Sequence, residues 1–282
     1  MVENKRWLDI LAHAVLLLGL LVVVFPVYIA IVASTHTSGD FLTGMIPLLP
    51  STHAIENYKA ILFSGIDNSG TPPISLMLFN SLLMALIVAI GKIAISITSA
   101  FAIVYFRFRF RMLAFWLIFV TLMLPVEVRI MPTYKVVADL GMLNSYAGLS
   151  LPLIASATAT FLFRQVFLTM PDELTEAARI DGAGPMKFFK DMLLPLSRTN
   201  MAALFVILFI FGWNQYLWPL LVTTDERFYT IVMGIKRMSS AVDAEPRWHL
   251  VMASVTLAML PPILVVIFMQ KLFVKGLVET EK

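Results

Sequence analysis

The sequence contains no cysteine and little charge: only 14% of its 282 residues are Asp, Glu, Lys or Arg. The absence of cysteine excludes disulfide bonds and cysteine-based metal sites. The low charge content excludes an ordinary soluble domain, in which about 25% of residues are charged. Because 59% of the residues are hydrophobic and the mean hydropathy is +0.86, the composition indicates an integral membrane protein.

Sequence motifs of enzymes are missing as well. Gly91-Lys92 lacks the upstream glycine of a phosphate-binding P-loop and is followed by Ile93, so we expect no ATP site of that kind. The four histidines are scattered without metal-ligand spacing, and no serine lies in a G-x-S-x-G sequence. We therefore expect a chain that is not an enzyme, with no catalytic residue, no metal site and no cofactor of its own.

Long charge-free runs dominate the sequence, and a membrane-spanning helix needs about 20 apolar residues. These runs are continuous, whereas the strands of a membrane barrel alternate apolar and polar residues. The sequence therefore predicts an all-α membrane protein that forms a single transmembrane domain over residues 1–282. The six predicted spans lie at approximately 10–34, 77–105, 112–131, 146–168, 200–222 and 250–272.

Lysines and arginines set the expected orientation, because loops on the cytoplasmic side carry an excess of them. With the N-terminus placed inside, most lysines and arginines fall in cytoplasmic segments. We therefore expect both termini, and residues 171–195, on the cytoplasmic side. The basic run RFRFR at 107–111 is interpreted as a topology anchor rather than as a nucleic-acid patch.

The longest strongly polar run between two apolar spans is residues 171–195, PDELTEAARIDGAGPMKFFKDMLLP. A proline followed by two acids at 171–173 is typical of a helix start, because proline fits the first turn and acids complement the helix dipole. Gly182 and the glycine two residues later end that helix, and the proline after them can open a second one. The pattern predicts a helix, a glycine turn and a second helix, a shape suited to docking onto a soluble partner.

Several polar residues fall within or beside the predicted spans, where polar groups are costly and usually functional. Lys92 lies midway along the second span, and it either lines the path of an anionic solute or hydrogen-bonds a neighbouring helix. The third span is too short to carry Glu127 and Arg129 clear of the membrane, so Arg129 either lines an outer vestibule or reaches the lipid headgroups. Asn214 and Gln215 lie among outer aromatic residues and either hydrogen-bond across helices or face the path.

Residues 176–195 carry a spaced motif: Glu-Ala-Ala, three residues, Gly182, nine residues, then Met192-Leu193-Leu194-Pro195. This resembles the EAA motif of ABC importer permeases, EAA-x3-G-x9-I-x-L-P, with Met192 in place of isoleucine. In that family the motif forms coupling helices that dock on the ATP-binding subunit, and we call residues 171–195 the coupling segment. The resemblance and the character of the side chains assign docking to Glu176, Ala177, Ala178, Gly182, Phe188, Phe189 and Pro195.

Further matches narrow the resemblance and cover nearly the whole chain. Glu56-Asn57-Tyr58, Asn80-Ser81 and WNQYLWPLL at 213–221 resemble the maltose-type sugar importers. Four further segments resemble the permease subunits of sn-glycerol-3-phosphate importers. They are TLMLPVEVRI at 121–130, SYAGLSLPL at 145–153, SATATFLFRQ at 156–165 and FVKGLVETEK at 273–282. The resemblance implies a type I ABC importer architecture with six spans, in a bacterial inner membrane.

The resemblance also implies partners and a solute. The expected partners are a second permease subunit, two copies of an ATP-binding subunit that hold ATP and magnesium, a periplasmic solute-binding protein and membrane lipid, with no nucleic acid. The outer loop 225–248 is expected to reach into the solute-binding protein. The expected solute is sn-glycerol 3-phosphate, with glycerophosphodiesters beside it. A sugar or oligosaccharide is the alternative within this class, and an ion-driven secondary transporter, which predicts inverted repeats with broken helices, is the alternative outside it.

Overall fold

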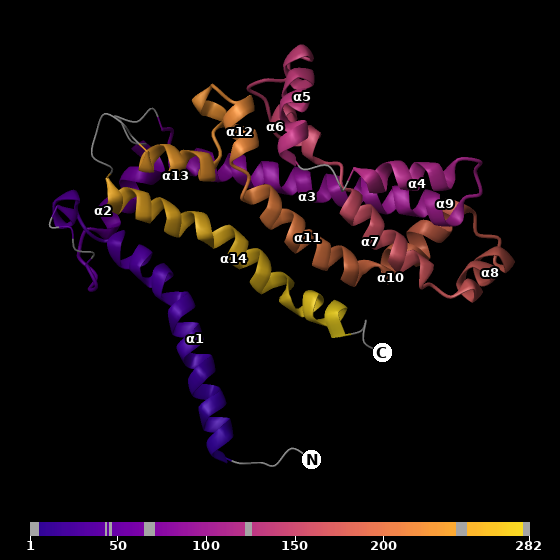
Figure 1. Ribbon diagram of the computed structural model, residues 1–282, viewed down its shortest axis with the longest axis horizontal. Helices are drawn as coiled ribbons and strands as arrows, with labels where there is room; N and C mark the ends of the chain where they lie inside the picture. Colours follow the sequence, from indigo (N-terminus) through magenta and orange to yellow (C-terminus); the bar gives the residue numbers. More distant parts are fainter. Residues whose placement is uncertain are drawn as a thin grey trace. The chain divides into compact units, whose positions relative to one another are not determined.

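The computed structural model describes residues 6–42, 44, 47–64, 71–121, 126–240 and 247–278, without the side chains of 6, 126, 127 and 271–278. This described part consists of helices and connecting turns, without a β-strand (Figure 1). The α-helices are, in chain order, α1 (Arg6–Ala33), α2 (Ala54–Lys59), α3 (Ile74–Tyr105), α4 (Arg111–Val120), α5 (Val126–Asp139), α6 (Tyr146–Ser150), α7 (Ala157–Leu168), α8 (Asp172–Ile180), α9 (Pro185–Phe188), α10 (Leu194–Leu196), α11 (Arg198–Trp213), α12 (Leu217–Val222), α13 (Ile231–Ser239) and α14 (Trp248–Val278). The short 3₁₀-helices are η1 (Ser38–Phe41), η3 (Leu151–Leu153) and η5 (Glu226–Phe228), and the π-helical turns are η2 (Ala60–Ser64) and η4 (Phe189–Leu193).

Three described helices are long and apolar enough to cross a membrane, namely α3, Trp7–Ala33 within α1 and Trp248–Gln270 within α14. Two bent pairs pass the same test as broken spans. Tyr146–Leu153 joins α7 at an angle of 47°, and Pro185–Leu196 joins α11 at 71°. The described chain therefore offers three to five spans by length and composition, and the predicted number of six stays a prediction.

Besides the bent span expected at 146–168, two predicted spans are interrupted in the structure. The span expected at 112–131 falls on α4 and the start of α5, and residues 122–125 between them lie outside the described residues. The span expected at 200–222 is divided into α11 and α12. Pro219 explains this second break, because it lies in the first turn of α12, where its missing N–H costs nothing. Inside a continuous helix the same proline would remove a hydrogen bond and clash with the preceding turn.

The described chain packs as two compact units, one formed by residues 1–76 with 234–260 and the other by 77–233 with 261–282. In the first unit Asn57 fastens α2 to the end of α1. Its Nδ2 donates hydrogen bonds to the carbonyls of Ser34 and His36, each at 2.8 Å. Satisfying these carbonyls caps the helix end, which otherwise lacks partners. The single transmembrane domain expected over 1–282 stays a prediction.

In the second unit the N-terminal half of α3 holds the segment around η5. Asn80 is fully buried and donates to the carbonyls of Arg227 and Tyr229 at 2.8 and 2.9 Å. Its Oδ1 accepts a hydrogen bond from the Tyr146 hydroxyl at 2.8 Å. Ser81 adds a fourth bond, because its Oγ accepts from the N–H of Ile231 at 2.8 Å. A short polar pair on α3 thus fixes three distant segments at one point.

Helices α3 and α11 approach each other closely at a glycine. A Cβ built on Gly212 would lie 2.9 Å from the Cα of Ala85 and 3.4 Å from the Cβ of Val88. Real Cβ atoms do not approach backbone atoms that closely. Small residues allow such contact between helices in membranes, where packing rather than the hydrophobic effect drives association.

The contact at Gly212 predicts the effect of adding one methyl group. Gly212→Ala is expected to destabilise the protein by about 1–3 kcal/mol, the usual cost of overpacking, because the new methyl group meets the α3 backbone. Thermal unfolding of the purified protein in detergent measures the loss. Gly19→Ala is the matched control, since Gly19 also lies in a long apolar helix but has nothing within 4 Å of an added Cβ. Equal melting temperatures for the two variants would contradict the close contact.

Candidate functional site: the coupling segment and the buried lysine

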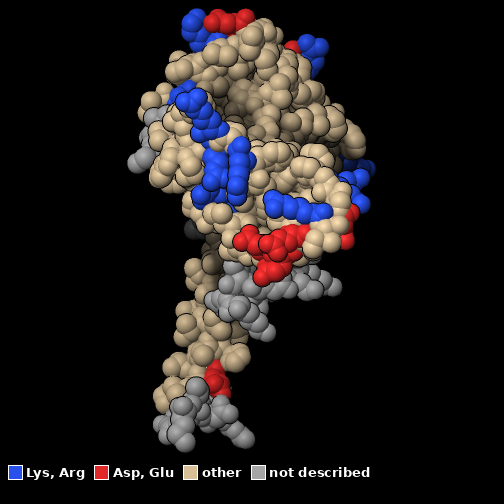
Figure 2. Space-filling model, turned by 90° about the vertical axis from the view of Figure 1, so that its right-hand side faces the viewer, with Lys and Arg blue, Asp and Glu red and all other residues tan. Residues whose placement is uncertain are grey.

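Helix α8 opens the coupling segment as the sequence predicts. Pro171 stands immediately before it with an extended backbone (φ −60°, ψ 139°), and two acids occupy the first turn. Carboxylates at that end complement the positive pole of the helix. Ala178 is buried, whereas Glu176 and Ala177 are exposed. Figure 2 shows the face that carries α8, on which basic and acidic side chains form separate groups.

The turn after α8 is a hydrogen-bonded C-cap that needs a glycine. Gly182 has φ +67°, in the left-handed region. Its N–H donates to the Arg179 carbonyl at 3.1 Å, and the N–H of Ala183 donates to the Ala178 carbonyl at 2.8 Å. These are the two bonds of a Schellman motif. Nothing lies within 4 Å of a Cβ built on Gly182, so the requirement is for backbone conformation rather than for space.

Aromatic rings fasten the far side of the turn to the C-terminal end of α3. The Phe189 and Phe101 rings lie 4.7 Å apart between centroids, and those of Phe188 and Tyr105 lie 5.3 Å apart. Phe188 and Phe189 are only 7% and 8% exposed. Both rings are covered by α3 within this chain, and the assignment of these two phenylalanines to docking stays a prediction. Their burial removes a large apolar area from water within the chain itself.

Exposed apolar side chains on the coupling segment are found elsewhere, at two residues that the sequence did not single out. Ile180 is 85% exposed at the end of α8, and Met186 is 70% exposed in α9. They lie on either side of the glycine turn, and Pro195 farther along is exposed too. The sequence could have indicated Ile180, because this isoleucine lies on the polar face of an amphipathic helix. Large exposed apolar side chains of this kind are suited to packing against another protein.

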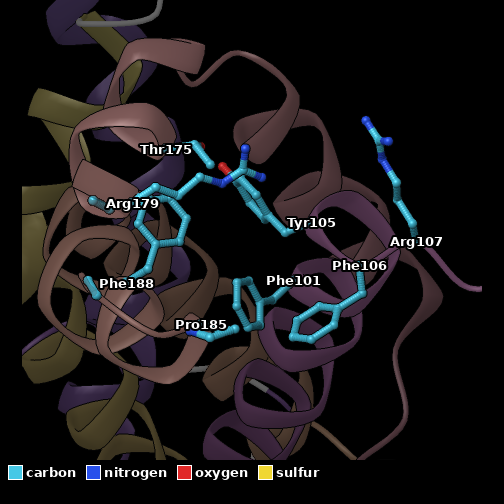
Figure 3. Close-up of a pocket in the computed structure, with 10 residues that line it drawn as sticks. Phe101, Tyr105, Phe106, Arg107, Thr175, Arg179, Pro185 and Phe188 are labelled. Carbon is cyan, nitrogen blue, oxygen red and sulfur yellow. The ribbon is translucent and has the colours of Figure 1, made fainter. Parts of the chain in front are cut away.

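A cavity of about 320 Å³ lies between the coupling segment and the end of α3 (Figure 3). Phe101 and Tyr105 line it from α3, Arg179 from α8 and Phe188 from α9. In the close-up the Arg179 side chain extends toward Tyr105, whereas Arg107 points away. The coupling segment therefore touches α3 through a few aromatic rings rather than through a filled interface.

Lys92 lies in the middle of α3 and is only 7% exposed. Its Nζ is 3.7 Å from the centroid of the Phe211 ring on α11. No described carboxylate lies within ion-pair distance of it. A desolvated ammonium over an aromatic face gains about 2 kcal/mol. The arrangement is a buried positive charge that rests on a ring and has no anion in the described part of the chain.

The remaining candidates for lining the path of the solute lie on α5 and after α11. Arg129 is exposed, Asn214 is exposed, and the Glu127 side chain lies outside the described residues. Gln215 donates from Nε2 to the Phe211 carbonyl at 3.0 Å. Phe211 thus contacts both the Lys92 ammonium and the Gln215 amide. The sequence did not indicate Phe211, because its place depends on how α3 packs on α11. In the part of the chain that the structure describes, no group of three or more His, Asp or Glu side chains is placed to hold a metal ion.

Residues 92–279 match the family model of binding-protein-dependent transport system inner membrane components. Three similar full-length proteins each carry the name sn-glycerol-3-phosphate transport system permease protein UgpE. They come from Agrobacterium fabrum (58% identical), Brucella melitensis (57%) and Pectobacterium atrosepticum (57%). Each alignment covers all 282 residues of this chain and the whole of the relative.

The fold matches a solved crystal structure of a bacterial ABC transporter involved in the import of the acidic polysaccharide alginate. The TM-score is 0.81 at 19% sequence identity, and the match covers 96% of this chain and 98% of the other. At that identity the likeness concerns the fold alone. It confirms the all-α fold of a type I ABC importer permease that the sequence predicts.

The C-cap geometry predicts that Gly182→Ala loosens the turn. An L-residue in the left-handed region costs roughly 1–2 kcal/mol, so local opening of the end of α8 should become about fivefold to thirtyfold more frequent. Hydrogen–deuterium exchange of the amides around Ala183 measures this. Gly184→Ala is the matched control, because Gly184 has φ −70° and also has open space around an added Cβ. If both variants exchange like the parent protein, the glycine requirement is wrong.

Proposed function

This chain belongs to the family of binding-protein-dependent transport system inner membrane components, and we propose that the solute it moves is sn-glycerol 3-phosphate. The observation that carries the proposal is the buried ammonium of Lys92, which rests on Phe211 with no described carboxylate at ion-pair distance. A phosphate ester supplies the negative charge that this site lacks. The name shared by the full-length relatives, which refers to sn-glycerol-3-phosphate transport, supports the same solute.

We assign the phosphate group of the solute to the two basic path candidates, Lys92 and Arg129. Its hydroxyl groups are assigned to the two amide side chains among the path candidates. The ring contact holds Lys92 without an ion pair, so an arriving phosphate draws the ammonium away without breaking a salt bridge. Arg129 adds a planar guanidinium that can bind a phosphate through two hydrogen bonds. Asn214 and Gln215 offer amide donors and acceptors for the glycerol hydroxyls. Glu127 stays a path candidate from sequence only.

The transport cycle that we propose needs partners that hydrolyse ATP and deliver the solute. They are a second permease subunit, two ATP-binding subunits that hold ATP and magnesium, and a periplasmic solute-binding protein. Both termini and the coupling segment lie on the cytoplasmic side, in line with the distribution of lysine and arginine. Movement of the ATP-binding subunits reaches the spans as a rigid-body shift of the coupling segment.

Docking on the ATP-binding subunit uses the exposed side of the coupling segment. Glu176 and Ala177 face outward from α8, and Ile180 and Met186 supply exposed apolar surface beside the glycine turn. Gly182 and Pro195 set the course of the backbone. Ala178, Phe188 and Phe189 are buried, so their part is to pass a displacement of the segment to α3.

One other solute class and one other transport mechanism are possible outcomes of the test and are not part of the proposal. A sugar or oligosaccharide importer would bind its solute through amides and aromatic rings and would not depend on a buried cation. An ion-driven transporter would keep working after ATP is depleted and stop when the ion gradient collapses.

Lys92→Met tests the solute assignment. A charge-assisted contact is worth roughly 1.5–3 kcal/mol, so uptake efficiency for labelled sn-glycerol 3-phosphate should fall about tenfold to a hundredfold. Uptake into cells or proteoliposomes that contain all four kinds of subunit measures the effect. Lys59→Met is the control, since it removes an exposed lysine from α2 and should leave uptake unchanged. The amount of each variant in the membrane is measured in parallel.

Unchanged uptake kinetics for Lys92→Met at equal membrane levels would contradict the role of Lys92. Uptake of a labelled disaccharide by the parent protein, without uptake of the phosphate ester, would replace the proposed solute with a sugar. Uptake that survives ATP depletion would overturn the importer mechanism itself.

A further inference from the structure

A second cavity, of about 330 Å³, lies where α3 ends, α4 begins and α8 starts. Arg107 lines it just after α3, Arg111 at the first residue of α4 and Arg179 in the last turn of α8. None of the three guanidiniums has a carboxylate within ion-pair distance in the described part of the chain. Asp172 is the single acid among the lining residues, so three positive charges face one negative charge. The cavity therefore carries an excess of positive charge that the chain itself does not neutralise.

The end of α7 adds apolar residues to the lining of this cavity, namely Phe167, Leu168 and Met170. The helices α3 and α7 belong to predicted spans, and they end here together. The cavity thus combines three arginines with apolar neighbours at the ends of two predicted spans. Figure 2 shows basic side chains gathered side by side on this face of the molecule.

The cavity and the surface assigned to docking occupy adjacent parts of α8, because Glu176 lies about 40° and Ile180 about 80° from Asp172 around the helix. Asp172 and Arg179 are seven residues apart, about two helical turns, and lie on one face of α8, which turns toward α3. Glu176 and Ile180 are exposed and do not line the cavity. A protein that packs on Ile180 therefore need not fill the arginine-lined cavity.

We propose that this cavity binds the headgroup phosphate of an anionic phospholipid of the cytoplasmic leaflet. Guanidinium groups bind phosphate through paired, charge-assisted hydrogen bonds, and basic pockets between spans on the cytoplasmic side hold acidic lipid headgroups. Leu168, which is 52% exposed at the end of α7, favours a lipid over free phosphate, because an acyl chain can continue along it. The bound lipid bridges α3, α4 and α8 and so holds the start of the coupling segment against the membrane.

The lipid site is tested by retention of phosphatidylglycerol. The full-length protein, with the subunits that purify with it, is placed in phosphatidylcholine nanodiscs containing increasing amounts of phosphatidylglycerol. Mass spectrometry then measures how much phosphatidylglycerol stays bound. The parent protein should retain phosphatidylglycerol. In the double variant Arg107→Gln/Arg111→Gln, the phosphatidylglycerol fraction needed for half-maximal retention should rise by about tenfold for each arginine replaced. Arg111→Lys keeps the charge and should show an intermediate loss, because an ammonium cannot bind through a planar fork.

Arg109→Gln is the matched control. Arg109 belongs to the same basic run, but its guanidinium lies 5.5 Å from the Phe110 ring centroid, and it does not line the cavity. This variant loses the same charge next to the same span, and it should retain lipid like the parent protein. Equal losses for Arg109→Gln and Arg111→Gln, or no retention by the parent protein, would overturn the proposal. Displacement of the lipid by millimolar inorganic phosphate would assign the site to free phosphate and would overturn it too.

Discussion

The contact of four aromatic rings at the C-terminal end of α3 is the interaction on which the rest of this structure depends. Phe188 and Phe189 of the coupling segment pack on Tyr105 and Phe101, with centroid separations of 5.3 and 4.7 Å. Aromatic pairs of this kind contribute about 0.5–1.5 kcal/mol beyond their buried area. A displacement of the coupling segment therefore has a direct route into α3.

Helix α3 connects the features of the second unit because each depends on a different stretch of its length. Asn80 near its start holds the segment around η5, and Ala85 receives Gly212 of α11. Lys92 lies about 13 Å before Phe101 along the axis, at 1.5 Å per residue. A single rigid rod thus joins the proposed solute cation to the proposed docking element. Close packing transmits such shifts because well-packed interfaces resist continuous deformation.

The local features of the coupling segment could be predicted from sequence, because they depend on neighbours in the chain. Pro171 begins α8, and Gly182 ends it with the left-handed turn that glycine favours. The environment of Phe188 and Phe189 could not be predicted in this way, since it depends on which face of α3 turns toward them. The same limit applies to Phe211 opposite Lys92. The break before α12 was readable from Pro219, but the absence of charged residues over 199–224 concealed it.

The coupling function that we propose requires the coupling segment to face the cytoplasm and to dock on an ATP-binding subunit. The chain has no cysteine, so Ile180→Cys provides a single labelling site at a side chain that is 85% exposed. The most direct measurement is its reaction with a membrane-impermeant maleimide in inside-out and right-side-out vesicles. We expect labelling only in inside-out vesicles, and we expect the ATP-binding subunit to protect the cysteine when it is added. Labelling from the outer side, or labelling that the ATP-binding subunit does not reduce, would contradict the proposed coupling function.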